Sequence, residues 1–217
     1  MTRLRQVPRS EVPDDIRGLY ELLFGDRDPV AEPGTDTGTP GNWWTVFALV
    51  PDCFRHAVDG FRFYRDPARE LDPVLREFAQ TRAGYAAQSQ FVYSQHCKAL
   101  RALGVDDGRI AALSAWQTSA LFTDVERAVL AWTDCLVLEG GRASDATFAA
   151  LKLHLSDAAI LELSYVTCTY AMHATLCRAL RLEYDDVPER IVEIPAPGDD
   201  GGPAADAMAV VDDGGAR

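Results

Sequence analysis

Apolar residues recur at helical spacing from residue 42 onward, and no stretch shows the sustained two-residue alternation that half-buried strands require. Residues typical of helix ends punctuate this pattern. Asp72 precedes a first-turn proline, Thr123 with Glu126 forms a capping box, and Gly104 closes a helical run. The expected helices span 42–48, 53–64, 72–87, 89–103, 106–114, 123–138, 144–153 and 156–182, after a short one within 1–24. The sequence therefore predicts an all-α, multi-helix bundle.

Two segments interrupt the helical pattern. Residues 25–41 are rich in Gly, Pro, Asp and Thr, which predicts a long loop. Residues 195–217 hold five aspartates against one arginine, and we expect a disordered acidic tail because so little apolar surface cannot offset the entropy of ordering. Residues 1–194 are then a single helical domain. Asn42 and Asp52 are expected to cap the two helices that follow the loop.

Charge and cysteine usage exclude several classes of function. The 21 basic and 33 acidic residues give a net charge of −12, which disfavours binding to nucleic acid or to anionic lipid. The longest mostly apolar stretch, residues 43–50, has only eight residues including Thr45, and the N-terminus lacks the apolar core of a signal peptide, so we expect a cytoplasmic protein. Its five cysteines should be reduced thiols, Cys53 and Cys135 in the core, and none forms a C-x-x-C pair. We expect no metal and no cofactor.

Two expected helices carry a pair of residues suited to chemistry. Glu77 lies ten residues before the expected turn at Ala87, and His96 lies nine after it. Residues equidistant from the turn of a helical hairpin lie at the same height, so these side chains can meet across the interface between the two helices, here called the seam. Burial is expected to raise the pKa of the carboxyl, and a carboxylate with an imidazole can transfer protons. On spacing alone a structural role for the two residues is the more common case, because structural ion pairs often mimic sites.

The stretch from Leu75 to Leu113 reads LREFAQTRAGYAAQSQFVYSQHCKALRALGVDDGRIAAL. It resembles the core motif of the carboxymuconolactone decarboxylase and alkylhydroperoxidase-D-like (AhpD-like) superfamily, with a Glu and a His 19 positions apart and a helix ending at a glycine. LFTDVERAVLAWTD and the long segment after residue 154 extend the resemblance. It implies an all-α fold that assembles with copies of itself, as a trimer or hexamer.

The chain also departs from this pattern. Redox members carry a C-x-x-C dithiol seven and four residues before the His, where this chain has Ser89 and Val92. The dithiol peroxidase mechanism is therefore excluded. The resemblance implies that Glu77 and His96 are catalytic. Tyr93 and Ser89, with Cys97 beside them, are expected to line a substrate pocket.

Three functions follow as alternatives. The first is an enzyme that uses Glu77 and His96 to move a proton on a lactone, enol or keto acid, by decarboxylation or isomerisation. The second is a thiol-dependent peroxidase that uses Cys97 and an external resolving thiol. The third is a non-catalytic oligomeric binding module, which a dry, inert seam around His96 would favour. The substrate itself is not determined by the sequence.

Overall fold

The computed structural model describes residues 2–183, and this part of the chain is helical, with no strand. The predicted all-α class is confirmed. The predicted tail over 195–217 and the end of the predicted domain lie outside the described residues. The helices are α1 (Asp14–Phe24), α2 (Asn42–Phe47), α3 (Pro51–Arg65), α4 (Pro73–Ala86), α5 (Gln90–Ala102), α6 (Asp107–Ala112), α7 (Asp124–Val137), α8 (Asp145–Lys152) and α9 (Asp157–Leu180), with short 3₁₀ helices η1 (Arg9–Glu11) and η2 (Leu113–Thr118).

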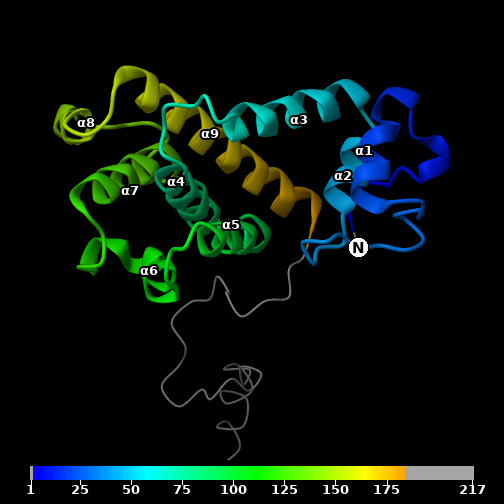
Figure 1. Cartoon of the computed structure of the whole chain (residues 1–217), viewed down its shortest axis with the longest axis horizontal. Coiled ribbons are helices and arrows are strands. Elements are labelled where there is room, and N and C mark those ends of the chain that lie inside the picture. The colour runs from blue at the N-terminus through cyan, green and yellow to red at the C-terminus, as the bar shows by residue number, and fades with distance from the viewer. Residues whose placement is uncertain (1, 184–217) are drawn as a thin grey trace, which may run out of the picture.

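The helices form two groups that one long helix joins (Figure 1). On one side α4 packs against α5, α7 and α9, with α6 and α8 at the edge. On the other side lie α1 and α2, and α3 leads from them toward α4. Because α9 crosses from the first group to the second, its side chains reach both, including the seam between α4 and α5.

Several predicted helix starts are confirmed by their capping bonds. The Asp72 carboxylate accepts hydrogen bonds from the backbone nitrogens of Val74 and Leu75, at 2.8 and 3.1 Å. Thr123 and Glu126 form a reciprocal capping box at the start of α7. These side chains satisfy backbone N–H groups that have no partner within the helix, and so fix where α4 and α7 begin.

The hairpin of α4 and α5 is held in register by a close helix contact. A Cβ atom added to Gly84 would lie 2.7 Å from the backbone nitrogen of Tyr93, so only glycine fits at this position. The backbone nitrogen of Ser89 also donates to the carbonyl oxygen of Gly84, at 2.9 Å. This contact fixes which residues of α4 lie opposite which residues of α5.

Two of the predicted caps and one predicted core residue are wrong. Asn42 does not cap its own helix; its side-chain oxygen accepts from the backbone nitrogen of Glu183 at 2.7 Å. The Glu183 carboxylate instead accepts from the nitrogens of Gly41 and Trp43 at the start of α2. Asp52 lies in the first turn of α3, which begins at Pro51 without a side-chain cap. Cys53 is exposed.

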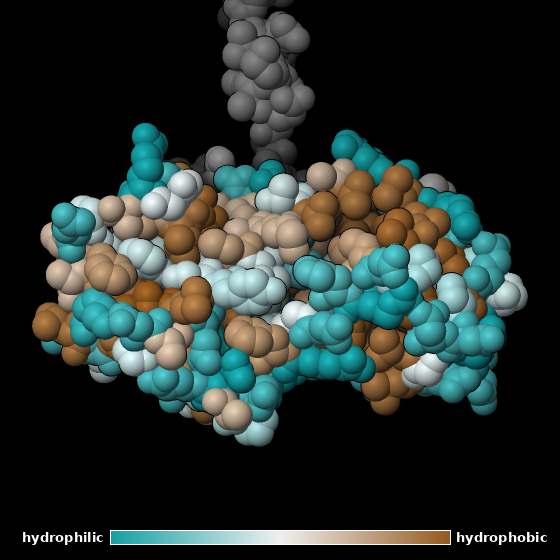
Figure 2. Space-filling view, turned by 90° about the horizontal axis from the view of Figure 1, so that it is seen from above, coloured by the Kyte–Doolittle hydropathy of each residue, from teal (hydrophilic) through white to brown (hydrophobic). Residues whose placement is uncertain are grey.

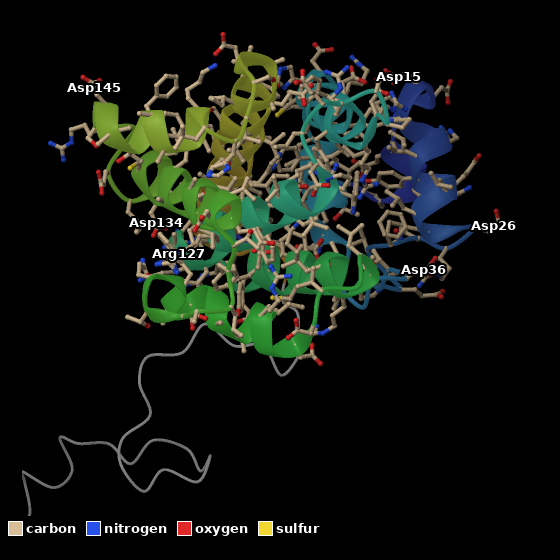
Figure 3. The ribbon with its side chains drawn as sticks, turned by 60° about the vertical axis from the view of Figure 1, so that its left-hand side comes forward. Asp15, Asp26, Asp36, Arg127, Asp134 and Asp145 are labelled. Atoms are coloured by element: carbon tan, nitrogen blue, oxygen red, sulfur yellow. The ribbon has the colours of Figure 1, made fainter. Side chains whose placement is uncertain are left out.

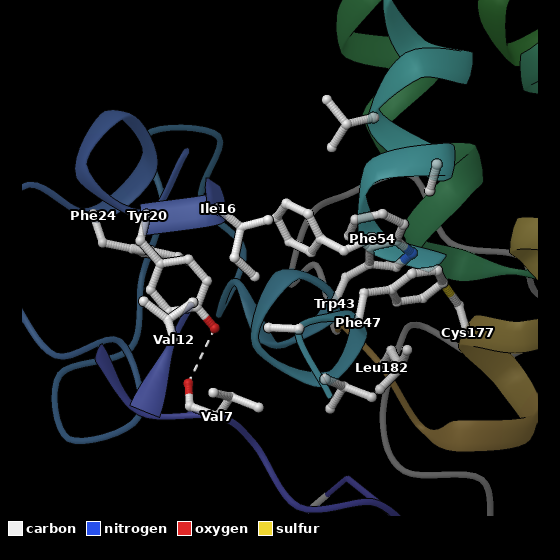
Figure 4. Close-up of a cluster of buried hydrophobic side chains, with 14 residues drawn as sticks. Val7, Val12, Ile16, Tyr20, Phe24, Trp43, Phe47, Phe54, Cys177 and Leu182 are labelled. Carbon is white, nitrogen blue, oxygen red and sulfur yellow. Dashed lines mark hydrogen bonds between the residues drawn. The ribbon is translucent and has the colours of Figure 1, made fainter. Parts of the chain in front are cut away.

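A hydrophobic cluster joins α1, α2 and α3 to the C-terminal end of α9 (Figure 4). The Tyr20 hydroxyl donates to the carbonyl oxygen of Val7 at 3.0 Å, which ties the N-terminal segment to α1. Trp43 stacks on Phe47 with ring centroids 3.9 Å apart.

Residues 25–41 form the predicted loop. Lys98 of α5 donates to the carbonyl oxygen of Thr37 at 2.8 Å and holds this loop against the bundle.

Acidic side chains spread over the surface account for much of the negative charge. Asp15, Asp26, Asp36 and Asp145 are exposed at the periphery (Figure 3). Apolar side chains also reach the surface, in groups separated by polar residues on the face shown in Figure 2. Between residues 2 and 183, no helix is both long enough and apolar enough to span a membrane.

Candidate active site

The structure brings Glu77 of α4 and His96 of α5 together. Nδ1 of His96 lies 2.7 Å from Oε2 of Glu77. Glu77 is 5% exposed and His96 is 8% exposed. An imidazole and a carboxylate at this distance share a hydrogen bond in which a proton is already positioned for transfer.

The Glu77 carboxylate is held by two further side chains. Nη2 and Nε of Arg76 lie 3.2 and 3.4 Å from Oε1 of Glu77. The Gln80 side chain is fully buried one turn further along α4, and the amide orientation that satisfies its hydrogen bonds places its nitrogen 3.0 Å from the same Oε1. Both carboxylate oxygens therefore accept hydrogen bonds, which stabilises the ionised form.

The charge state of Glu77 differs from the expectation based on burial alone. Burial does raise the pKa of this carboxyl, but the charge and hydrogen bond of His96, together with Arg76, outweigh it and lower the pKa below its usual value. Glu77 is thus a carboxylate at neutral pH and can only accept hydrogen bonds. It follows that Nδ1 of His96 carries the shared proton and that Nε2 is the nitrogen available for chemistry.

Tyr170, one of a hydrogen-bonded pair of tyrosines from two other helices, packs against His96. The ring of Tyr170 on α9 meets the imidazole edge-to-face, with centroids 4.4 Å apart. The Tyr170 hydroxyl is 2.5 Å from the hydroxyl of Tyr64 on α3. Burial raises the pKa of both phenols, so both stay protonated. Arg76 donates to the carbonyl oxygen of Tyr64 at 2.8 Å, which links this pair back to Glu77.

The three residues predicted to line a substrate pocket lie in different surroundings. Ser89 is the N-cap of α5, and its hydroxyl accepts from the backbone nitrogen of Val92 at 3.4 Å. It stands seven residues before His96, about 10 Å along the helix. Tyr93 is buried and packs edge-to-face on Tyr85. Cys97 is fully buried in a hydrophobic cluster.

A second buried histidine lies near the pair, a position that the sequence did not indicate. His173 of α9 is 4% exposed, and its Nδ1 has no hydrogen-bond partner among the described residues. Aromatic rings surround it: those of Trp43, Phe47, Phe61 and Tyr170. Burial lowers the pKa of His173 to about 4, and the charge on nearby His96 adds to this effect. His173 is therefore neutral at pH 7.

A small pocket lies beside the pair without including it. Arg76 and Tyr64, which contact Glu77 and Tyr170, are part of its lining, but neither Glu77 nor His96 is. Within the described residues, no three His, Cys, Asp or Glu side chains gather as a metal ion would require.

Comparisons with known proteins agree with this architecture. Residues 54–134 match the model of the carboxymuconolactone decarboxylase family. A peroxidase-related protein with the alkylhydroperoxidase AhpD core from Ralstonia eutropha JMP134 is 17% identical, with a TM-score of 0.67 over 85% of this chain and 93% of that one. A peroxidase-related protein from Silicibacter sp. TM1040 is 15% identical, with a TM-score of 0.68 over 88% of this chain and 96% of that one.

A third solved structure has a different chemistry. A cysteine-to-alanine variant of the debrominase Bmp8, in complex with 2,3,4-tribromopyrrole, is 18% identical, with a TM-score of 0.62 over 85% of this chain and 91% of that one. No match was found among the curated proteins. At these identities the solved structures establish the fold alone. Together with the family match, they confirm the resemblance on which the sequence interpretation rested.

Proposed function

We propose, from the premise that residues 54–134 carry the carboxymuconolactone decarboxylase motif within an AhpD-like fold, that this chain is an acid–base enzyme. Its substrate class is a small lactone, enol or keto acid. The reaction is isomerisation or decarboxylation next to a carbonyl group. The observation that carries the proposal is the 2.7 Å contact between Nδ1 of His96 and Oε2 of Glu77, both buried.

The two residues have different tasks in this proposal. Ionised Glu77 fixes the tautomer of His96 and stabilises the imidazolium that forms when Nε2 takes a proton. In an isomerisation, Nε2 removes a proton from the carbon next to the carbonyl group, leaving an enolate, and returns it to another carbon. In a decarboxylation, loss of CO₂ leaves the enolate, and His96 passes it a proton that Nε2 has taken up from solvent, which restores the neutral imidazole. Arg76 and Gln80 keep the carboxylate in place throughout.

Tyr93 and Ser89 are proposed to line the substrate pocket, as the resemblance implies, with Tyr93 as a hydrogen-bond donor. Self-association is also proposed. Leu161, Tyr165 and Met172 are exposed along one face of α9 at helical spacing, and a second copy of the chain would cover such an apolar face. The mass of the protein in solution tests this.

A non-catalytic binding module is the second candidate. One observation favours it: Glu77 and His96 are almost entirely buried, and the pocket beside them includes neither. A structural ion pair in a dry seam has the same geometry as a resting catalytic pair. The two candidates differ in whether replacing either residue changes a chemical rate.

A panel of substrates separates these candidates. Enol lactones and β-keto acids are incubated with the protein, and product formation is followed by NMR. We expect turnover of at least one class, and its loss in Glu77→Gln and His96→Ala. Exposed Glu139 and His154 supply the matched controls, Glu139→Gln and His154→Ala, which should retain activity. Full turnover in both Glu77→Gln and His96→Ala would remove the proposal.

A further inference from the structure

The outward face of α9 exposes no charge along most of its length. The exposed residues between positions 158 and 175 are all uncharged: Ala158, Leu161, Tyr165, Cys168, Met172 and Thr175. Leu161, Tyr165 and Met172 are 70%, 47% and 49% exposed. A surface helix normally presents charged and polar residues to water, and this face of α9 does not. We call Leu161, Tyr165, Cys168 and Met172 the α9 stripe.

The opposite face of α9 is already covered by the bundle. Leu163, Val166 and Tyr170 are buried against neighbouring helices. A helix that is apolar on all its faces is normally buried on all of them. The members of the α9 stripe recur at intervals of four, three and four residues, which are the intervals of a heptad repeat. The α9 stripe is therefore suited to packing against one further helix.

The α9 stripe is symmetric about a point midway between positions 166 and 167. When the direction of the chain is reversed about this point, Leu161 takes the place of Met172, and Tyr165 takes the place of Cys168. Two copies of α9 that a two-fold axis through this point relates run antiparallel. Leu161 of one copy then lies opposite Met172 of the other, and Tyr165 lies opposite Cys168. The stripe is thus complementary to itself.

Opposite charges stand at the two ends of the stripe. Asp157 precedes it, and its side chain is 89% exposed although it pairs with Lys152 at 2.6 Å. Arg178 follows it and is exposed, with one nitrogen 3.0 Å from the carbonyl oxygen of Ala87. An antiparallel pair brings Asp157 of one copy to the end where the other copy has Arg178. A parallel pair would bring like charges together, so the charges favour the antiparallel arrangement.

We propose that the α9 stripe binds the α9 stripe of a second copy of this chain, antiparallel and about a two-fold axis. The inference rests on the self-association included in the proposed function, and not on its acid–base chemistry. A ring of three copies has no two-fold axis, whereas a dimer has one and a hexamer of two such rings has several. The assembly should therefore contain an even number of copies.

The mass of the full-length protein in solution tests this surface. Leu161→Asp should weaken self-association at least about tenfold, because it places an unpaired charge in the interface. Leu22, 79% exposed on α1, supplies the control: Leu22→Asp should keep the wild-type mass. A trimeric wild type, or a wild-type mass in Leu161→Asp, overturns the surface alone. A monomeric wild type overturns self-association as well.

A pair of introduced charges tests which residues lie opposite each other. Met172→Lys alone should weaken association as Leu161→Asp does. When the two substitutions are combined, each new carboxylate faces a new ammonium group of the second copy, and association should recover at least about tenfold. The two positions lie about 16 Å apart along one helix, so the new charges cannot pair within a chain. Combined losses without recovery overturn the antiparallel register.

Disulfide crosslinking tests the centre of the interface. In Tyr165→Cys, with exposed Cys53 removed as Cys53→Ser, the new thiol lies opposite Cys168 of the second copy. Oxidation should give a dimer joined from position 165 to position 168, and the exposed control Glu139→Cys in the same background should give none. Links from 165 to 165 in their place overturn the proposal.

Failure of the surface and failure of the acid–base function are distinguishable. If the stripe variants change the mass as expected while Glu77→Gln and His96→Ala keep full turnover, the surface stands and the acid–base function fails. If those two variants lose turnover while Leu161→Asp keeps the wild-type mass, the acid–base function stands and the surface is overturned.

Discussion

Nδ1 of His96 lies 2.7 Å from Oε2 of Glu77, although 19 positions separate the two residues in the sequence. The other oxygen of the carboxylate is held by Arg76. Because the donors around Glu77 lower the pKa of its carboxyl despite burial, the pair consists of an anionic acceptor and an imidazole with its proton on Nδ1. This arrangement leaves Nε2 as the atom that exchanges protons with a substrate.

The tautomer of His96 can be measured without a substrate. Nitrogen-15 NMR of the neutral imidazole should show Nδ1 protonated and Nε2 unprotonated, because an ionised carboxylate accepts the Nδ1 proton. In Glu77→Gln the amide no longer enforces that tautomer, and the two nitrogen signals should move toward those of a mixture. A wild-type spectrum with the proton on Nε2 contradicts the geometry.

The ring of Tyr170 should affect activity, whereas its hydroxyl should affect only stability. Tyr170→Phe keeps the ring against His96 but leaves the buried Tyr64 hydroxyl without its partner, which should cost about 1–2 kcal/mol of unfolding free energy with activity retained. Tyr170→Leu removes the ring itself and should lower kcat about tenfold through loss of positioning. Kinetics and urea unfolding on both variants check this. Equal activity in both would show that the ring does not position His96.

His173 should make stability depend on pH. Its folded pKa of about 4 lies below the ordinary value of 6.5, so the unfolded chain binds more protons in this window. The contribution of neutral His173 to the unfolding free energy is fully present above about pH 6.5 and is lost as pH falls toward 4. Between pH 7 and pH 5 this loss amounts to about 2 kcal/mol. In His173→Phe most of this loss should disappear, whereas the exposed control His154→Gln should behave as wild type. If the unfolding free energy depended on pH in the same way in all three proteins, His173 would not be the group responsible.

Cys97 should be dispensable for turnover. The thiol is fully buried in a hydrophobic cluster, out of reach of a bulky peroxide or an external thiol. Cys97→Ser should keep acid–base activity while losing about 1–3 kcal/mol of stability, because it buries a hydroxyl. Exposed Cys168 provides the matched control, Cys168→Ser. A peroxidase activity that Cys97→Ser abolishes and Cys168→Ser retains would establish the thiol mechanism instead.

Local sequence signals predicted much of the fold. Asp72, Thr123 and Glu126 mark helix starts because their capping bonds lie within three residues of the chain. That Glu77 and His96 lie opposite each other followed from their similar distances from the hairpin turn, because both helices have the same rise per residue. The cap of α2 was assigned to Asn42 and was wrong, because the capping carboxylate comes from Glu183, far along the chain.

The surroundings of the pair were not predictable in the same way. Tyr64 and Tyr170 come from α3 and α9, and nothing in their local sequence indicates which helix they face. The direction of the Glu77 pKa shift depends on His96 and Arg76 together, whereas burial alone suggested the opposite.

A double-mutant cycle on proton exchange tests whether Glu77 and His96 act as one acid–base unit. The measured quantity is the rate of deuterium incorporation next to the carbonyl group of a substrate that the wild type turns over, in wild type, Glu77→Gln, His96→Gln and the double variant. If the two residues act as one unit, each single variant loses at least about 100-fold and the double variant loses no more. Losses that multiply in the double variant, or single variants that exchange at the wild-type rate, would show that the two residues do not act as one acid–base unit.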